Sequence, residues 1–190
     1  MKILVAEDDS NLAQGYKDAL ESRHHEVILA ANGEECLEKY TYEAQYKRSQ
    51  SSLATDEKEK EPPQSREFHK RMLNLPFDVV ILDYKMPKKD GLQVAKEILD
   101  LNPDQRIIFA SGYVKDTLID SVKYLKRVVE LLQKPFGLQQ LIDTVEDQEA
   151  FEALNKLIVN IRSIKDPDAS KEEVKRLFEN LRRIQKYRTY

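Results

Sequence analysis

Five polar residues stand at the ends of short apolar runs in this chain, and their types could serve one reaction. They supply three carboxylates, one hydroxyl and one ammonium, and in chain order they are Glu7, Asp8, Asp83, Ser111 and Lys134. Carboxylates that lie a few ångströms apart cannot all stay ionised unless a cation neutralises them. Mg²⁺ suits such a group, because it takes oxygen ligands and is commonly held by one or two carboxylates. If these residues meet, they therefore form a magnesium site.

The same residues could transfer a phosphoryl group. In such a site Asp83 can act as a nucleophile toward a phosphoryl donor and become an aspartyl phosphate. The metal and the Lys134 ammonium would neutralise the charge on the phosphoryl oxygens, and the Ser111 hydroxyl would donate to one of them. We therefore expect catalysis by positioning and electrostatics.

Apolar runs predict the strands that would bring these residues together. They cover residues 2–6, 26–30, 79–82, 106–111 and 128–133. The run at 79–82 is wholly apolar, as a strand buried on both faces of a parallel sheet requires. We expect an α/β fold with a doubly wound, flavodoxin-like parallel sheet of order 2-1-3-4-5. In this order strands 1, 3, 4 and 5 are neighbours, so their carboxyl ends converge.

Apolar residues at helical spacing predict helices between these strands. The first helix would be capped by Ser10 or Asn11 and would bury Leu12, Tyr16, Ala19 and Leu20. The helix after the third strand would begin at Gly91, and one after the fourth strand would run from residue 116 or 117 to Leu125. The helix after the fifth strand would bury Leu138, Leu141, Ile142 and Val145.

Two stretches depart from this regular pattern. Residues 41–76 separate the second helix from the third strand, where a βα unit needs only a few residues. We interpret them as an insertion in which 40–47 lengthens the helix and the charged middle, 50–64, is a mobile loop. It would be either an elaborated surface loop or a docking or dimer element. Residues 1–147 would then form one domain, and 148–190 a helical extension.

The extension has the pattern of two helices broken at 166–168. Such a hairpin is too small for a core of its own, so it would pack on the first domain or on a second copy, and we favour a homodimer. Residues 171–190 contain seven basic and three acidic side chains, which leaves DNA contact open beside a solvated helix face. No complete helix-turn-helix fits in the remaining length.

Composition restricts the class of protein. With 31 basic and 34 acidic residues the net charge is −3, which gives no general attraction to nucleic acid or an anionic membrane. The single cysteine, Cys36, rules out an internal disulfide and is expected to be a small buried residue. The first apolar run is too short for a signal peptide or a membrane span, so we expect a soluble cytoplasmic protein.

Four motifs in order carry a family resemblance. At 3–9, 80–91, 108–112 and 132–136 they read ILVAEDD, VILDYKMPKKDG, IFASG and LQKPF. On these motifs the chain resembles a response-regulator receiver domain of two-component signalling. The resemblance implies that Asp83 accepts a phosphoryl group from the phosphohistidine of a sensor histidine kinase or a phosphotransfer protein.

The resemblance also implies a role for each residue of the site. The Mg²⁺ ligands would be Glu7, Asp8, Asp83 and the main-chain carbonyl of Lys85. Ser111 and Lys134 would grip the phosphate, and the Lys134–Pro135 peptide bond would be cis.

One residue position departs from what the family usually has. Leu131 stands where receiver domains commonly have an aromatic residue that rotates on phosphorylation, so Tyr113 would have to take over part of that role. Lys85 and Tyr113 also stand where side chains flank the phosphoryl group. A cation and a bulky ring there would hinder water, so we expect a long-lived phosphorylated form.

Two other classes of protein compete with this interpretation. One is a receiver-fold interaction module that works without phosphorylation, against which the complete set of site residues argues. The other is a phosphatase with an aspartate nucleophile, which would need an acid two residues after Asp83, where this chain has Lys85. We therefore expect an acceptor of phosphoryl groups rather than an enzyme that turns over an external substrate.

Overall fold

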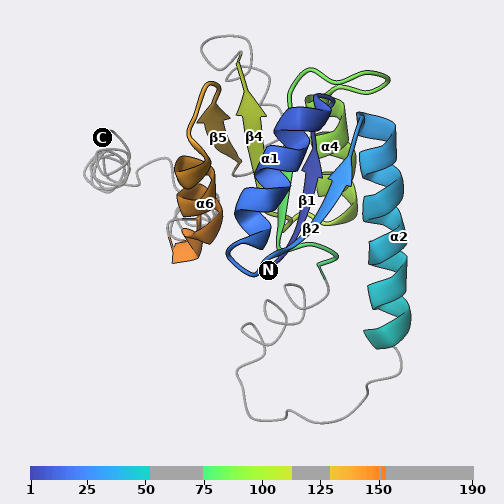
Figure 1. Cartoon of the computed structure of the whole chain (residues 1–190). Coiled ribbons are helices and arrows are strands. Elements are labelled where there is room, and N and C mark those ends of the chain that lie inside the picture. Colours follow the sequence, from blue (N-terminus) through green and yellow to red (C-terminus); the bar gives the residue numbers. More distant parts are fainter. Residues whose placement is uncertain (52–74, 113–128, 150, 153–190) are drawn as a thin grey trace, which may run out of the picture. The chain divides into compact units, whose positions relative to one another are not determined.

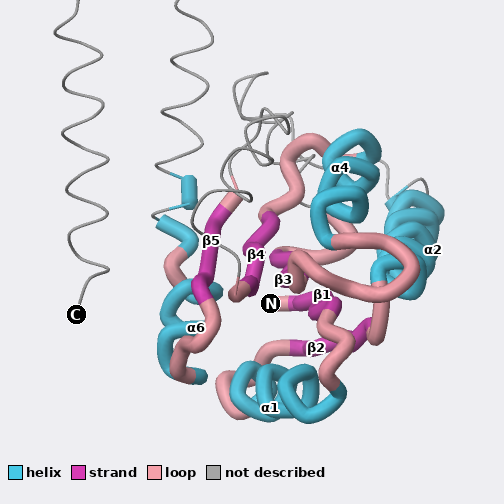
Figure 2. The backbone as a smooth tube through the Cα atoms, turned by 90° about the horizontal axis from the view of Figure 1, so that it is seen from above, coloured by secondary structure: helices cyan, strands magenta, loops and turns pink. Residues whose placement is uncertain are grey.

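The computed structural model describes residues 1–51, 75–112, 129–149 and 151–152. In these residues the chain forms a five-stranded sheet of order β2-β1-β3-β4-β5, and each neighbouring pair is parallel. The strands, labelled in Figure 1 except for β3, which is labelled in Figure 2, are β1 Lys2–Ala6, β2 Glu26–Ala30, β3 Val79–Leu82, β4 Ile107–Ser111 and β5 Glu130–Gln133. The predicted fold class and strand order are confirmed.

Helices cover both faces of this sheet, as the alternation of strands and helices requires. Their bounds are α1 Ser10–Glu21, α2 Gly33–Ser51, α4 Gly91–Leu101 and α6 Leu138–Glu146. Seen from above in Figure 2, α1 lies on one face of the sheet, while α2 and α4 lie side by side on the other. The helix predicted over 116–125 lies outside the described residues.

The chain divides into two compact units, Met1–Ile142 and Asp143–Tyr190. The first unit holds the sheet and all of the predicted site residues. The extension predicted for 148–190 lies outside the described residues except at 148, 149, 151 and 152, so its hairpin, its dimer contact and its DNA contact stay predictions. In the part of the chain that the structure describes, no helix is both long and apolar enough to cross a membrane.

The core is built from the central strands and the helix faces packed on them. All residues of β3 and β4 are buried, which is the environment that their continuous apolar runs predict. Cys36 of α2 is also fully buried, as predicted, and burial raises the pKa of its thiol to about 12. Burial therefore keeps this thiol in its protonated form.

Two helices bury slightly different faces from those predicted. Leu12 is 42% exposed and Leu138 is 46% exposed, although both were expected in the core. In α1 the buried residues are Ala13, Tyr16 and Leu20, so Ala13 takes the place expected for Leu12. Both exposed leucines lie in the first turn of a helix, where the chain is still leaving the carboxyl end of the sheet.

Three element ends also differ from the predictions. Asp9, rather than Ser10 or Asn11, caps α1, because its side chain accepts from the main-chain N–H of Asn11 at 2.9 Å and of Leu12 at 3.0 Å. The fourth strand begins at residue 107 rather than 106, because its pairing with β3 starts with Val80 opposite Ile107. The fifth begins at 130 rather than 128, where Glu130 pairs with Ile108.

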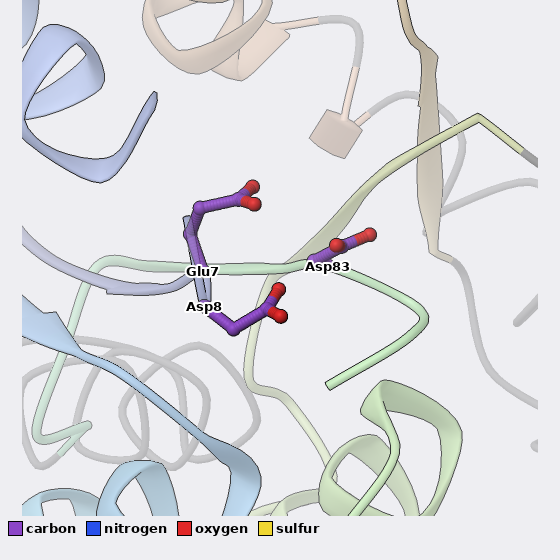
Figure 3. Close-up of side chains that lie close together, drawn as sticks. All are labelled: Glu7, Asp8 and Asp83. Carbon is purple, nitrogen blue, oxygen red and sulfur yellow. The ribbon is translucent and has the colours of Figure 1, made fainter. Parts of the chain in front are cut away.

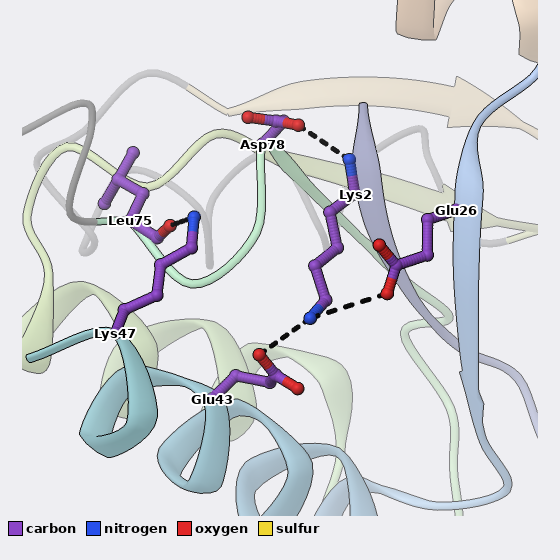
Figure 4. Close-up of polar contacts among 6 residues, drawn as sticks. All are labelled: Lys2, Glu26, Glu43, Lys47, Leu75 and Asp78. Atoms are coloured by element: carbon purple, nitrogen blue, oxygen red, sulfur yellow. Dashed lines mark hydrogen bonds and ion pairs between the residues drawn. The ribbon is translucent and has the colours of Figure 1, made fainter. Parts of the chain in front are cut away.

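α2 extends through residue 51, so the first part of the predicted insertion is helical. Residues 50 and 51 belong to this helix, and the rest of the predicted mobile loop lies outside the described residues. The last turns of α2 are tied to the chain before β3, since Lys47 Nζ donates to the carbonyl oxygen of Leu75 at 2.6 Å (Figure 4). The two described ends of the insertion therefore meet at the amino ends of the strands.

Candidate phosphoryl-acceptor site

The three acids of the predicted site lie at the carboxyl ends of two adjacent strands. Glu7 and Asp8 follow β1, and Asp83 follows β3. Main-chain hydrogen bonds continue just past the strand ends: Asp83 N–H donates to Ala6 O at 2.9 Å, and Glu7 N–H donates to Ala30 O at 3.0 Å. These bonds fix where each carboxylate leaves the backbone. The ligand oxygens of the three acids consequently lie within 4.8 Å of one another, as Figure 3 illustrates.

Lys134 supplies the positive charge of the site. Its Nζ donates to Glu7 Oε2 at 2.6 Å and lies 3.4 Å from Asp83 Oδ2. Its main-chain N–H donates to Ser111 O at 2.9 Å, so the end of β5 is held beside the end of β4. One ammonium is thus shared by two carboxylates, while Asp8 lies exposed at the rim.

Burial makes the charge of Glu7 costly. Its residue is 3% exposed, and desolvation raises the pKa of its carboxyl group. The hydrogen bond and charge of Lys134 act in the opposite direction, whereas the neighbouring charge of Asp83 raises the pKa further. The pKa of Glu7 is raised on balance, so Lys134 does not fully offset the effects of burial and of the Asp83 charge.

Ser111 and Lys85 occupy the same edge of the sheet. Ser111 is the last residue of β4 and is 1% exposed. Lys85 lies two residues after Asp83 in the β3–α4 loop, and its side chain is exposed. The Lys134–Pro135 peptide bond is cis, which confirms the expectation drawn from the resemblance.

A glycine holds the β3–α4 loop close to Asp83. Gly91 N–H donates to Tyr84 O at 2.9 Å, and a Cβ added at Gly91 would stand 2.2 Å from the carbonyl oxygen of Asp83. Asp90 caps α4 by accepting from the N–H of Gln93 at 2.8 Å. A side chain at position 91 would therefore push the loop away from Asp83.

Sequence reasoning missed a pair of aromatic rings beside the site. Tyr16, expected only as a core residue of α1, stacks on Phe136 with ring centroids 5.5 Å apart and an interplanar angle of 23°. Burial raises the pKa of the Tyr16 hydroxyl, and so do the negative charges of Glu7, Asp83 and Asp9. No local pattern links residues so far apart in sequence, although Phe136 does belong to one of the four motifs.

The residues that would govern switching are only partly described. Leu131 is half-buried in β5 and packs against the core, without the aromatic ring usual at this position. Tyr113 lies outside the described residues, so its predicted role stays a prediction.

The donor set fits a hard divalent cation. All three side chains present carboxylate oxygens, which are the ligands that Mg²⁺ and Ca²⁺ prefer. Among the described residues, no histidine or cysteine belongs to this group of close ligand atoms. Three carboxylates and the single ammonium of Lys134 leave two negative charges that a divalent cation could neutralise.

Known proteins are similar to this chain in both sequence and fold. Residues 56–146 match the family model of the response regulator receiver domain. The chain is similar to the response regulator receiver protein CpdR of Brucella abortus, with 25% identity over 145 residues that cover 76% of this chain and 93% of CpdR.

Two solved structures have the same architecture. A receiver domain from Clostridium thermocellum has a TM-score of 0.53 and 27% identity, covering 80% of this chain and 97% of that one. The response regulator TrrA of Thermotoga maritima, solved with Mg²⁺ and beryllium fluoride, has a TM-score of 0.52 and 26% identity, covering 76% and 96%. The motifs, the sheet order and these similarities show that the chain is similar to response regulator receiver domains in both sequence and fold.

Proposed function

We propose that this chain accepts a phosphoryl group on Asp83 from the phosphohistidine of a sensor histidine kinase or a phosphotransfer protein, in a reaction that depends on Mg²⁺. The observation that carries the proposal is the convergence of Glu7, Asp8 and Asp83 within 4.8 Å, with Lys134 Nζ 3.4 Å from the Asp83 carboxylate. Receiver domains are signalling domains rather than turnover enzymes, and the product would accordingly stay on the protein.

In the proposed reaction a carboxylate oxygen of Asp83 attacks the phosphorus atom. The P–N bond to the donor imidazole breaks as the new P–O bond forms, and the bonding electron pair remains on the imidazole nitrogen. Lys134, whose Nζ lies 3.4 Å from Asp83 Oδ2, would neutralise charge on the phosphoryl oxygens, and the hydroxyl of Ser111 would donate to one of them. Positioning and electrostatics would supply most of the acceleration.

The metal would be held by Glu7, Asp8, Asp83 and the main-chain carbonyl of Lys85. When bound, Mg²⁺ supplies positive charge that offsets the carboxylates and the incoming phosphoryl oxygens. Glu7, whose charge is costly without a cation, would gain most from this neutralisation.

Phosphorylation would relay a signal by changing the surface and the association state of the protein. The described residues leave the output open: the homodimer or DNA contact predicted for 148–190 remains a proposal. The exposed Lys85 beside the acceptor would hinder the approach of water, so we propose a long-lived phosphorylated form.

The test is phosphorylation by a small phosphodonor such as acetyl phosphate, followed by intact mass. We expect the mass of one phosphoryl group to be added only when Mg²⁺ is present, and expect Asp83→Asn to stay unlabelled. Size-exclusion chromatography before and after labelling would report any change of association. A wild type that folds and binds Mg²⁺ but is never labelled would indicate the alternative, an interaction module that works without phosphorylation.

A further inference from the structure

The ammonium of Lys134 must be held accurately on a flexible stem. Its Nζ lies 2.6 Å from Glu7 Oε2 and 3.4 Å from Asp83 Oδ2, although a lysine side chain has four carbon atoms that rotate freely in solution. A shift of the backbone at this position would move the ammonium away from one of the two carboxylates. The segment around Lys134 therefore needs to be fixed.

Two contacts fix that segment, one on each side of the lysine. On the sheet side, the N–H of Lys134 donates to Ser111 O at 2.9 Å. On the other side, Phe136 stacks on Tyr16 of α1, with centroids 5.5 Å apart. α1 begins directly after the acids that follow β1, and Tyr16 is 5% exposed, so this ring is a firm support.

We propose that Tyr16 is a positioning residue for phosphoryl transfer: its ring stacks on Phe136, fixes the segment that carries Lys134, and so holds the ammonium between Glu7 and Asp83. This inference rests on the proposed function. The stack joins the acidic end of β1, through α1, to the lysine after β5. The two charged halves of the site are thereby held in register by an aromatic pair.

The alternative explanation is that Tyr16 only fills the core, and the chain offers variants that separate the two. Tyr16→Phe keeps the ring and the stack, whereas Tyr16→Leu keeps an apolar side chain but removes the stack. Phe136→Leu removes the same stack. Because Phe136 is only half-buried, this change should disturb the core less than Tyr16→Leu does. Leu20→Val is the matched control, because it alters another buried residue of α1.

The experiment compares the rate of Asp83 labelling by acetyl phosphate at saturating Mg²⁺ with the Mg²⁺ affinity measured by calorimetry. Loss of an aromatic pair should lower the labelling rate about three- to tenfold in Tyr16→Leu and in Phe136→Leu. Mg²⁺ affinity should stay the same or increase, since a displaced ammonium repels the cation less. Tyr16→Phe, which keeps the stack, should retain the labelling rate of the wild type, and so should Leu20→Val.

A double-mutant cycle makes the test specific. If the stack acts through Lys134, Tyr16→Leu should have no further effect on labelling once Lys134→Ala has removed the ammonium. Additive effects, or an equal loss in Leu20→Val, would overturn the inference, because both indicate a general loss of packing. If the wild type is labelled normally and Tyr16→Leu is labelled at the same rate, the inference is overturned but the proposed function stands. If the wild type is not labelled, both are overturned.

Discussion

Lysine and carboxylates gather at both edges of the sheet, but the two clusters differ in what the charges do to each other. At the amino edge, Lys2 Nζ binds Glu43 Oε2 at 2.7 Å and Glu26 Oε1 at 3.5 Å, and the main-chain N–H of Lys2 donates to Asp78 Oδ2 at 2.6 Å (Figure 4). At the carboxyl edge, Lys134 is shared by Glu7 and Asp83 while Asp8 lies close by.

The pKa shifts express this difference. Partial burial lowers the pKa of Lys2, yet its hydrogen bond to Glu43 and the charges of Glu43 and Glu26 raise it overall, so the charged form is favoured. The pKa of Glu7 is raised chiefly by burial, so its negative charge is more costly there than in water. At the amino edge the carboxylates favour the charged form of Lys2, whereas at the carboxyl edge three carboxylates converge within 4.8 Å, where a cation could neutralise them. Converging like charges, rather than the number of ion pairs, distinguish the edge at which we propose the function.

The largest expected contrast between the edges is in phosphorylation. Asp83→Asn should abolish labelling by acetyl phosphate, because the amide cannot form the aspartyl phosphate. Asp78→Asn, the matched change at the amino edge, should leave labelling at the level of the wild type. Intact mass with and without Mg²⁺ measures both, and labelling that survives Asp83→Asn would assign the acceptor elsewhere.

A smaller but still large effect is expected at Glu7. Glu7→Gln should lower the Mg²⁺ affinity about tenfold or more, because it removes one of the converging charges. Glu43→Gln at the amino edge should leave this affinity unchanged. Calorimetric titration with MgCl₂ measures both, and equal losses would contradict the division between the edges.

Glu7 should also give the metal-free protein a characteristic pH dependence. The pKa of the Glu7 carboxyl group in the folded protein is raised above its ordinary value of 4.5. Protonation of Glu7 therefore stabilises the folded state fully below pH 4.5, and this contribution is lost as the pH rises through the raised pKa. Urea unfolding of the wild type should show this decline, and Glu7→Gln should lack it. A wild type whose stability rises through the same interval would show that Lys134 outweighs burial.

Two glycines should respond in opposite directions to the same change. Gly91→Ala should destabilise the protein by about 1–3 kcal/mol, because its Cβ would stand 2.2 Å from Asp83 O, and it should slow labelling by displacing the acceptor loop. Gly15→Ala meets nothing within 4 Å and lies inside α1, so it should stabilise the protein by roughly 0.5–1 kcal/mol. Chemical denaturation compares the two.

The smallest effect is expected from removing the charge at the amino edge. Lys2→Met keeps an unbranched side chain near the ring of Phe77, 5.6 Å from the lysine ammonium, while losing the ion pairs. We expect a loss of roughly 0.5–1 kcal/mol of stability, since partly exposed ion pairs contribute little. The labelling rate and Mg²⁺ affinity should not change, and a change in either would mean that the two edges are coupled.

Much of the fold could be predicted because the central strands are unbroken runs of apolar residues. Val79–Leu82 has the pattern of a doubly buried strand, and a polar residue at or just after the end of four strands marks the carboxyl edge. The errors occur at element ends. Asp9 takes the cap expected of its neighbours and Leu12 is exposed, because only the tertiary path of the chain decides which residue of a first turn faces inward.

The sequence by itself determined which residues can carry the chemistry and the strand ends on which they lie, because both depend on residue type and on short-range periodicity. The tertiary structure alone decided how these residues are held: the single ammonium between Glu7 and Asp83, the close approach of Gly91, and the stacking of Tyr16 on Phe136. Each of these contacts joins separate elements through distances of a few ångströms. Local sequence patterns do not predict such distances, because the distances depend on how the strands pair and how the helices pack.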